Sequence, residues 1–315
     1  MKLRIHNYDE QMMTPKVAPI KFCIYSDDSR AETLKFINKI EEIGVKNRSK
    51  LTVDLSNVKF ASAAASLLLF AIVNRAQFLT KDPNLVRFIW PKKEKNAEGH
   101  KWIVGTGLSV ALLAGTKEKL KLLTEEERYF QSAVEPYPHL VTTVSMLQKQ
   151  ALLNEHQFDL LGKAIGEALL NVSHHAYEDE AFNQDLLLLE GKRWWQCAWF
   201  NPEENRVVFI ICDLGLGIFK SFRPQGDGFS VENEVSSVQR AMLDGESRFI
   251  GSGRGNGSED IKRPISTGSE DDEKLLVLTG RARYSYNSGD SSPRCERLAE
   301  YIPGTLLQWS LVPRR

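Results

Sequence analysis

The chain has 315 residues, of which 42% are apolar and 26% are charged, with 41 basic and 41 acidic side chains. At roughly 150 residues per domain, this length predicts about two domains that bury real cores. The balanced charge argues against a nucleic-acid-binding protein that depends on a bulk positive field. Four scattered cysteines without a C-x-x-C pair exclude a disulfide scaffold and the common zinc ribbons. They indicate a reducing, cytoplasmic compartment.

Neither a signal peptide nor a membrane span is expected. The start of the chain, MKLRIHNYDE, has no apolar region. The most apolar run, 61–73, is shorter than the roughly 20 residues that a spanning helix needs. We therefore expect a buried helix there and no membrane partner.

The first third of the chain alternates strand and helix patterns. Strands are predicted at 20–25, 51–55 and 85–90, and helices at 29–43 and 61–79. Ser29 and Glu32 fit a capping box at the start of the first helix, and Gly44 is expected to end it. The alternation predicts an α/β domain with a largely parallel sheet, assigned to residues 1–125.

A different pattern follows the weakly patterned region 92–138. Helices are predicted at 139–152 and 156–177, and strands at 193–200, 206–212, 274–279, 281–287 and 305–312. Helices followed by an antiparallel-looking sheet favour an α/β two-layer sandwich, which we assign to residues 126–315.

Glu167, Asn171 and His175 are four residues apart and are predicted to share one helix face. An apolar stripe lies on roughly the opposite side and comprises Leu161, Ile165, Leu169 and Val172. The Asn171 amide oxygen suits Mg²⁺, and a carboxylate one turn away can polarise a water or a hydroxyl. The alternative is a solvated polar face.

Asp213 directly follows the predicted strand 206–212, where a carboxylate is costly unless it has a partner. The exocyclic amine of adenine is a natural donor, and Gly215 and Gly217 would let the backbone turn and approach a planar base. An ordinary β-turn is the alternative. A dinucleotide fingerprint is disfavoured because Ser221 occupies the third glycine position.

The run G-S-G-R-G-N-G, residues 251–257, has glycine at alternate positions. Its N–H groups can converge on an anion, and the short helix expected at 258–263 points its positive end the same way. A flexible loop is the alternative. The pair Gly304-Thr305 enters the last strand.

The order of these four elements resembles the GHKL ATPase superfamily over residues 139–315, and A-I-G-E-A-L-L-N-V-S-H-H-A is most similar to the anti-sigma-factor serine kinases. The resemblance implies ATP and Mg²⁺ as ligands. It implies Glu167 as general base, Asn171 as Mg²⁺ ligand, Asp213 as adenine reader, Thr305 and His175 at the nucleotide, Gly253, Gly255 and Gly257 in the phosphate loop, and a lid over 219–249. Ser258 replaces the usual Leu, and Pro264 is expected to cut the following helix short, so we expect a loose loop and slow hydrolysis.

The segment L-T-V-D-L-S-N-V-K-F-A-S-A-A-A-S-L-L-L-F resembles STAS domains, with coverage of about 18–90. The Asp and acceptor Ser of the family's D-S-S-G-like motif are replaced by small residues at 61–65. Ser62 or Ser66 could accept a phosphate, although a helix cap or a core position is favoured. The resemblance implies a regulatory or docking module whose switch is lost or altered.

The leading hypothesis is a cytosolic Mg-ATP-binding protein that hydrolyses ATP or transfers its γ-phosphate to a protein hydroxyl. A complete histidine kinase is disfavoured because no phosphoacceptor His box precedes the second domain. The alternative is a non-catalytic, nucleotide-gated switch that binds a partner protein. A nucleic-acid-stimulated ATPase is a weaker alternative, since nucleic acid is an unlikely partner for a neutral chain. A homodimer is expected by analogy only.

Overall fold

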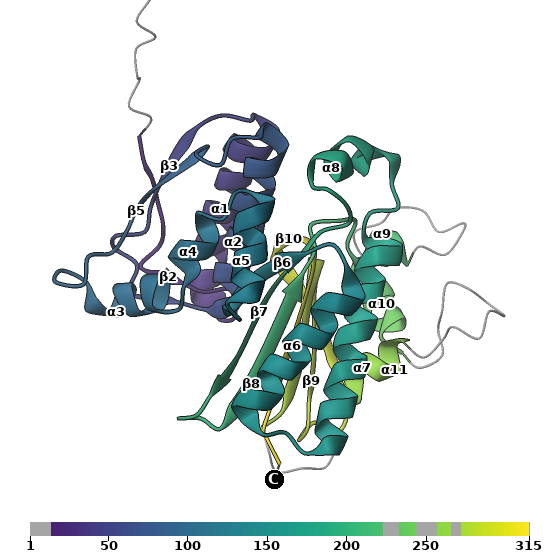
Figure 1. Ribbon diagram of the computed structural model, residues 1–315. Helices are drawn as coiled ribbons and strands as arrows, with labels where there is room; N and C mark the ends of the chain where they lie inside the picture. The colour runs from purple at the N-terminus through teal and green to yellow at the C-terminus, as the bar shows by residue number, and fades with distance from the viewer. Residues whose placement is uncertain (1–13, 223–232, 244–256, 266–271, 315) are drawn as a thin grey trace, which may run out of the picture.

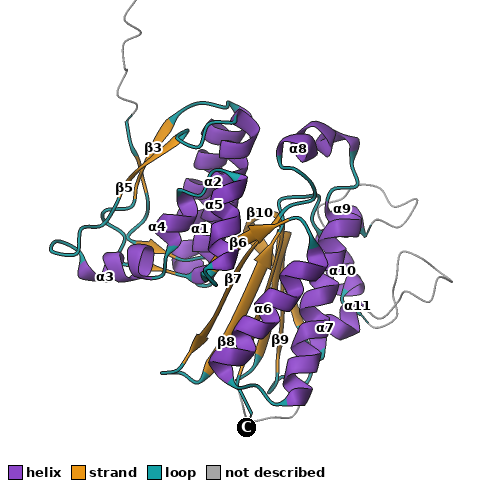
Figure 2. Ribbon diagram, in the orientation of Figure 1, coloured by secondary structure: helices purple, strands orange, loops and turns teal. Residues whose placement is uncertain are grey.

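The computed structural model describes residues 14–222, 233–243, 257–265 and 272–314, and these form a mixed α/β fold (Figures 1 and 2). The α-helices are α1 (Asp27–Ile40), α2 (Ala63–Thr80), α3 (Ala97–His100), α4 (Leu108–Leu112), α5 (Lys117–Glu125), α6 (Pro136–Ala151), α7 (Glu155–Asn171), α8 (Asn183–Leu188), α9 (Ile218–Ser221), α10 (Asn233–Ala241) and α11 (Gly257–Lys262). Wider π-helical turns cover Glu41–Lys46, Lys101–Gly105 and Val172–Ala176, and a 3₁₀ turn covers Glu180–Phe182.

The described strands form three sheets. They are β1 (Lys16–Val17), β2 (Lys21–Phe22), β3 (Leu51–Asp54), β4 (Phe60–Ala61), β5 (Val86–Ile89), β6 (Phe130–Ala133), β7 (Trp194–Asn201), β8 (Arg206–Cys212), β9 (Lys274–Asn287) and β10 (Arg294–Leu311). In the N-terminal half, β1-β3-β5 and β2-β4 pair in parallel, as predicted. In the C-terminal half, β6-β7-β8-β10-β9 form an antiparallel sheet.

Helices cover the five-stranded sheet on both faces. The helices α6 and α7 lie on one face, and α1 and α2 of the N-terminal half pack against the other (Figure 1). Along β8, Val207, Phe209 and Ile211 join the core under α6 and α7. The alternate residues Val208, Ile210 and Cys212 join the core under α1 and α2. Burial on both faces explains why this strand is a continuous apolar run.

Buried polar contacts add to this apolar interface. The Asn74 side chain of α2 donates to the Ala114 carbonyl at 3.0 Å and accepts from the Trp195 indole of β7 at 2.9 Å. The Tyr25 hydroxyl donates to the Gln308 side chain of β10 at 2.5 Å. The bonds from Trp195 to Asn74 and from Tyr25 to Gln308 link the N-terminal half to the sheet.

The first helix differs from its prediction at both ends. It begins after Ser26, and the Ser29 hydroxyl lies 2.7 Å from that of Ser26, so no capping box forms. Gly44 does not end the helix, which continues as a π-helical turn to Lys46 and packs Gly44 against Ala76 of α2. Tertiary packing outweighs the local stop signal here.

Two other predictions about helix ends are confirmed. Ser62 caps α2, where its hydroxyl accepts from the Ala65 N–H at 3.4 Å, and Ser62 and Ser66 are both buried. The helix α11 ends at Lys262, just before Pro264.

The last strands are longer than predicted. The strand β9 runs unbroken through Gly280, and β10 begins at Arg294, ahead of the predicted start at 305. Register shifts between Arg297 and Thr305 keep the two strands paired across this irregular stretch.

Among the described helices, α2 alone is long and apolar enough to cross a membrane by length and composition. In this fold, 83% of its apolar window is buried inside the protein. The expectation of a buried helix at this position is met.

We expect Asn74→Ala to destabilise the protein by about 2–3 kcal/mol, because it leaves the Trp195 indole and the Ala114 carbonyl buried without a partner. Urea unfolding monitored by circular dichroism measures this loss. Asn84→Ala, at an exposed position, is the matched control and should change the stability little. Equal stabilities for the two variants would contradict the structural role of Asn74.

Candidate functional site

The helix α7 presents a mixed face beside its apolar face. Its N-cap is Asn154, whose side chain accepts from the Gln157 N–H at 2.9 Å. The predicted apolar stripe is buried and comprises Leu161, Ile165, Leu169 and Val172. Glu167 and Asn171 remain half-buried on the other side, one turn apart, as the spacing predicted.

The Glu167 carboxyl lies in a crowded acidic setting. Gly257, the first residue of α11, packs so closely that an added Cβ would collide with Oε1 of Glu167. Burial raises the pKa of Glu167, and the nearby Asp260 carboxylate raises it further. His174 and a hydrogen bond from the Asn171 side chain act in the opposite direction. The result is a carboxyl group with raised proton affinity beside an amide and a glycine.

The imidazole that acts on Glu167 is that of His174. Residues 172–176 form a π-helical turn, so the α-helical spacing that predicted His175 on the face of Glu167 does not continue to that residue. The His175 Nδ1 instead lies 3.8 Å from the Glu178 carboxylate, beyond the end of the helix. The two histidine rings stay in contact, with centroids 5.9 Å apart.

Asp213 directly follows β8 and is buried. Its Oδ1 accepts from the Gly215 N–H at 2.8 Å, and its own N–H donates to the Thr305 carbonyl of β10 at 3.0 Å. Burial raises the pKa of Asp213 to about 6. A side chain that remains partly ionised while enclosed is ready to receive a donor.

A tight packing of backbone and hydroxyls surrounds Asp213. Gly304 has φ +64°, and an added Cβ would come within 2.8 Å of the Asp213 Oδ1, so only glycine fits here. The Thr279 hydroxyl donates to the Gly304 carbonyl at 2.9 Å and accepts from the Ile218 N–H at 3.1 Å. It also lies 3.4 Å from the Thr305 hydroxyl.

Thr279 is the member of this group that sequence reasoning missed. It is paired with Thr305 across β9 and β10, so its position depends on strand register. No motif around 279 marks it. The one available signal was that a polar residue precedes Gly280 in an otherwise apolar strand.

The helix that carries Glu167 and Asn171 contacts the turn that follows Asp213. The Ala176 carbonyl accepts from the Leu216 N–H at 2.7 Å, and Gly215 packs directly on that carbonyl. The Tyr177 hydroxyl accepts from the Leu214 N–H at 3.2 Å. Ala176 ends the π-helical turn that continues α7 beyond Asn171. Folding therefore packs the Asp213 turn against the end of the helix that carries Glu167 and Asn171.

The donor atoms on this face are hard oxygens. The Asn171 amide and the Glu167 carboxylate suit Mg²⁺, which keeps several waters and takes few protein ligands. Within the described ranges, no three His, Cys, Asp or Glu side chains gather as a metal site, so a ligand-rich metal centre is not part of this arrangement. Gly253 and Gly255 lie outside the described residues, as does most of 219–249.

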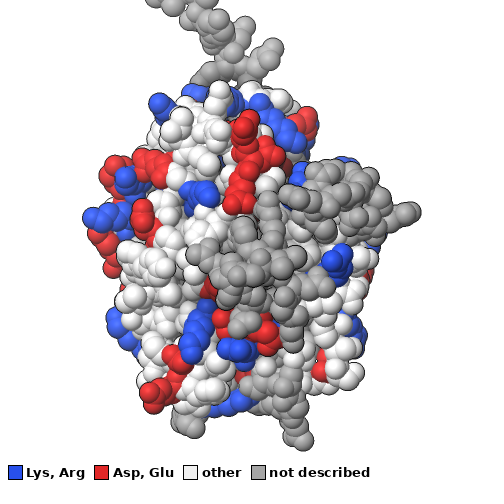
Figure 3. Space-filling view, turned by 90° about the vertical axis from the view of Figure 1, so that its right-hand side faces the viewer, with Lys and Arg blue, Asp and Glu red and all other residues white. Residues whose placement is uncertain are grey.

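Basic side chains near this face are paired with acids one turn away. Lys163 lies 2.9 Å from Asp159 on α7, and Arg263 lies 2.9 Å from Asp260 at the end of α11. Figure 3 shows Lys and Arg interspersed with Asp and Glu on the described surface of this side of the molecule.

Comparison with models of known protein families and with curated proteins finds no match to this chain.

Asp213→Asn should change how stability depends on pH. The pKa of the folded state, about 6, lies above the ordinary 3.8, so Asp213 lowers stability as the pH rises from about 4 to about 6. The effect amounts to about 3 kcal/mol. We expect equal stabilities near pH 4 and a more stable Asp213→Asn at pH 7, measured by urea unfolding across this range. A stability difference that does not vary with pH would contradict the burial of an ionisable Asp213.

Proposed function

We propose that this chain is a GHKL-type Mg-ATP-binding protein that either hydrolyses ATP or transfers its γ-phosphate to a protein hydroxyl. One observation carries the proposal. The Asp213 turn packs on the end of the helix that bears Glu167 and Asn171, and Gly257 packs on Glu167. Three segments that are far apart in sequence therefore lie against one another, and this packing supports the proposal.

In this proposal the adenine lies against the Asp213 turn. The carboxylate accepts a hydrogen bond from the exocyclic amine, in addition to the one that it accepts from the Gly215 N–H. Thr305 stands beside it, held by Thr279 at 3.4 Å. Gly215 packs on the Ala176 carbonyl and Gly217 packs on the Thr279 hydroxyl, so these two glycines shape the turn on which the base would lie.

The triphosphate extends toward α7 and the start of α11. Asn171 would hold Mg²⁺ with its amide oxygen, and the ion supplies charge neutralisation for the phosphates when bound. The oxygen of the attacking water or hydroxyl bonds to the γ-phosphorus, and Glu167 takes the proton that this oxygen loses. The bond from the γ-phosphorus to the β–γ bridging oxygen breaks, giving ADP and either phosphate or a phosphorylated hydroxyl.

A raised pKa suits Glu167 to this role, because a general base works best when its pKa approaches the working pH. The two outcomes differ only in the nucleophile that reaches this carboxylate. A partner protein with a Ser or Thr hydroxyl would make the reaction a kinase reaction, and water would make it an ATPase reaction.

We propose further that residues 1–125 form a STAS-like regulatory module and residues 126–315 the nucleotide domain. The packing of α1 and α2 on the sheet supports this role, since α2 lies on the strands whose ends carry the site. A cytosolic location is part of the proposal. It is supported by the four cysteines, which are all free thiols.

Glu167→Gln should retain ATP binding and lower turnover by about 100-fold or more, because it removes the base and keeps the shape. Incubation with γ-labelled ATP, scored for free phosphate and for labelled protein together, measures both outcomes. Glu155→Gln, at an exposed position in the first turn of the same helix, is the matched control and should leave turnover unchanged. Unchanged turnover in Glu167→Gln would remove Glu167 from the mechanism.

Asn171→Ala should abolish the Mg²⁺-dependent part of ATP affinity measured by isothermal titration calorimetry. Affinity that is unaltered in the presence of Mg²⁺ would contradict the assignment. If the wild-type protein binds ATP tightly with neither turnover nor transfer, the non-catalytic switch is favoured. The short α11, which ends before Pro264, is the feature that motivates this second candidate.

A further inference from the structure

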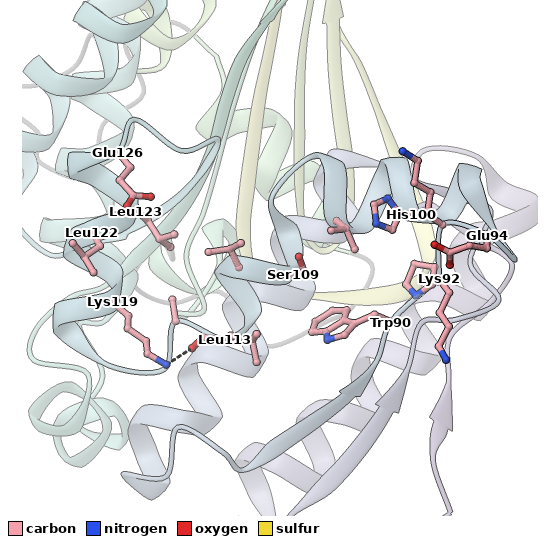
Figure 4. Close-up of a pocket in the computed structure, with 15 residues that line it drawn as sticks. Trp90, Lys92, Glu94, His100, Ser109, Leu113, Lys119, Leu122, Leu123 and Glu126 are labelled. Atoms are coloured by element: carbon pink, nitrogen blue, oxygen red, sulfur yellow. Dashed lines mark hydrogen bonds between the residues drawn. The ribbon is translucent and has the colours of Figure 1, made fainter.

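A cavity of about 620 Å³ opens in the N-terminal half, and none of the candidate site residues lines it (Figure 4). It lies between the end of β5, the loop that follows, and the helices α4 and α5. Its lining comprises Trp90, Pro91, Lys92, Lys93, Glu94, His100, Val104, Ser109, Val110, Leu113, Ala114, Lys119, Leu122, Leu123 and Glu126. The volume is that of a pocket for one small molecule, since such sites span roughly 300–1,000 Å³.

Several large apolar side chains that line this cavity are exposed to solvent. Val110 of α4 and Leu113, which follows that helix, are each 46% exposed, and Leu122 of α5 is 50% exposed. The Trp90 indole stacks on Phe88, with ring centroids 4.7 Å apart and an interplanar angle of 17°. In Figure 4 the Trp90 ring stands between the Leu113 side and the side with Lys92, Glu94 and His100. An apolar body is the ligand that gains most from these surfaces.

The charged groups at the rim favour an anion. Glu126 is already paired with Arg128 at 2.9 Å, and the Lys119 Nζ donates to the Leu113 carbonyl at 3.3 Å. Lys92 and Lys93 form no ion pair with the described part of the chain. Among the described residues that line the cavity, Glu94 is the acidic side chain closest in sequence to these two cations. An anionic group placed there would be attracted, and its apolar body would reach Trp90 and Leu113.

The wall of the cavity is held in place from behind. The Gln77 side chain of α2 donates to the Leu112 carbonyl at 3.1 Å, and Asn74 donates to the Ala114 carbonyl at 3.0 Å. Gly115 packs against Gln77 so closely that an added Cβ would lie 2.8 Å from its side chain. The turn after α4 is therefore fixed on the buried helix α2, and a preformed site binds with less loss of freedom.

We propose that this cavity is a binding site for a small amphipathic anion, with a flat or aliphatic apolar body on Trp90, Val110 and Leu113 and its acidic group at Lys92 and Lys93. The site is separate from the nucleotide proposal and does not depend on it. Its single-molecule volume and its fixed wall favour a small molecule over a peptide helix or a second copy of the chain.

The test compares two fluorescent probes of one shape. The anionic probe is 1-anilinonaphthalene-8-sulfonate, and N-phenyl-1-naphthylamine is the same ring system without the sulfonate. We expect saturable one-site binding of the sulfonate at pH 7. Leu113→Asp should weaken both probes roughly tenfold or more, because it places a carboxylate in the apolar part. The double substitution Lys92→Gln and Lys93→Gln should weaken the sulfonate roughly three- to fivefold and leave the neutral probe unchanged.

Leu187→Asp is the matched control, since Leu187 on α8 is 82% exposed and lies outside the cavity. It should bind both probes like the wild type, and thermal unfolding should show all variants folded. Probe binding that is unaltered in folded Leu113→Asp, or an absence of saturable binding in the wild type, would overturn the proposal. An equal loss of both probes in the double lysine variant would overturn the anion assignment. A wild-type dimer that Leu113→Asp dissociates would assign this surface to a second copy instead.

Discussion

The fold depends on one constraint, the burial of the strand β8 on both faces. Phe209 and Ile211 face α6 and α7, while Ile210 and Cys212 face α1 and α2. A strand covered on both sides must be apolar throughout, and the first polar side chain after it enters a site with little access to water. That side chain is Asp213. Its raised pKa follows directly from the position of the strand.

The same constraint joins the two halves of the chain. Because α1 and α2 supply one cover of the sheet, the N-terminal half is not an appendage to a finished domain. Trp195 on β7 bonds to Asn74 of α2 and is paired with Cys212, the residue before Asp213. The N-terminal core, the turn after α4 and the polar site therefore rest on the same pair of strands.

The sequence predicted what local pattern determines. The apolar stripe of α7, the face of Glu167 and Asn171, the cap at Ser62 and the end of α11 all depend on residues within a few turns. It failed where distant contacts decide. The capping-box pattern at Ser29 and Glu32 did not mark the helix start after Ser26, and the position of Thr279 depends on strand register. The double burial of β8 was visible in its unbroken apolar run, although alternation was the pattern expected of an antiparallel sheet.

The most direct measurement of the central claim is photolabelling with 8-azido-ATP, whose reactive group sits on the adenine ring. Peptide mapping then locates the protein segment beside the base. A nucleotide held at the end of β8 predicts labelling within 213–218 or around Thr305, and its suppression by excess ATP. Two results would contradict a purine site at Asp213. In one, the labelling that excess ATP suppresses lies only around Trp90 and Leu113. In the other, excess ATP suppresses no labelling.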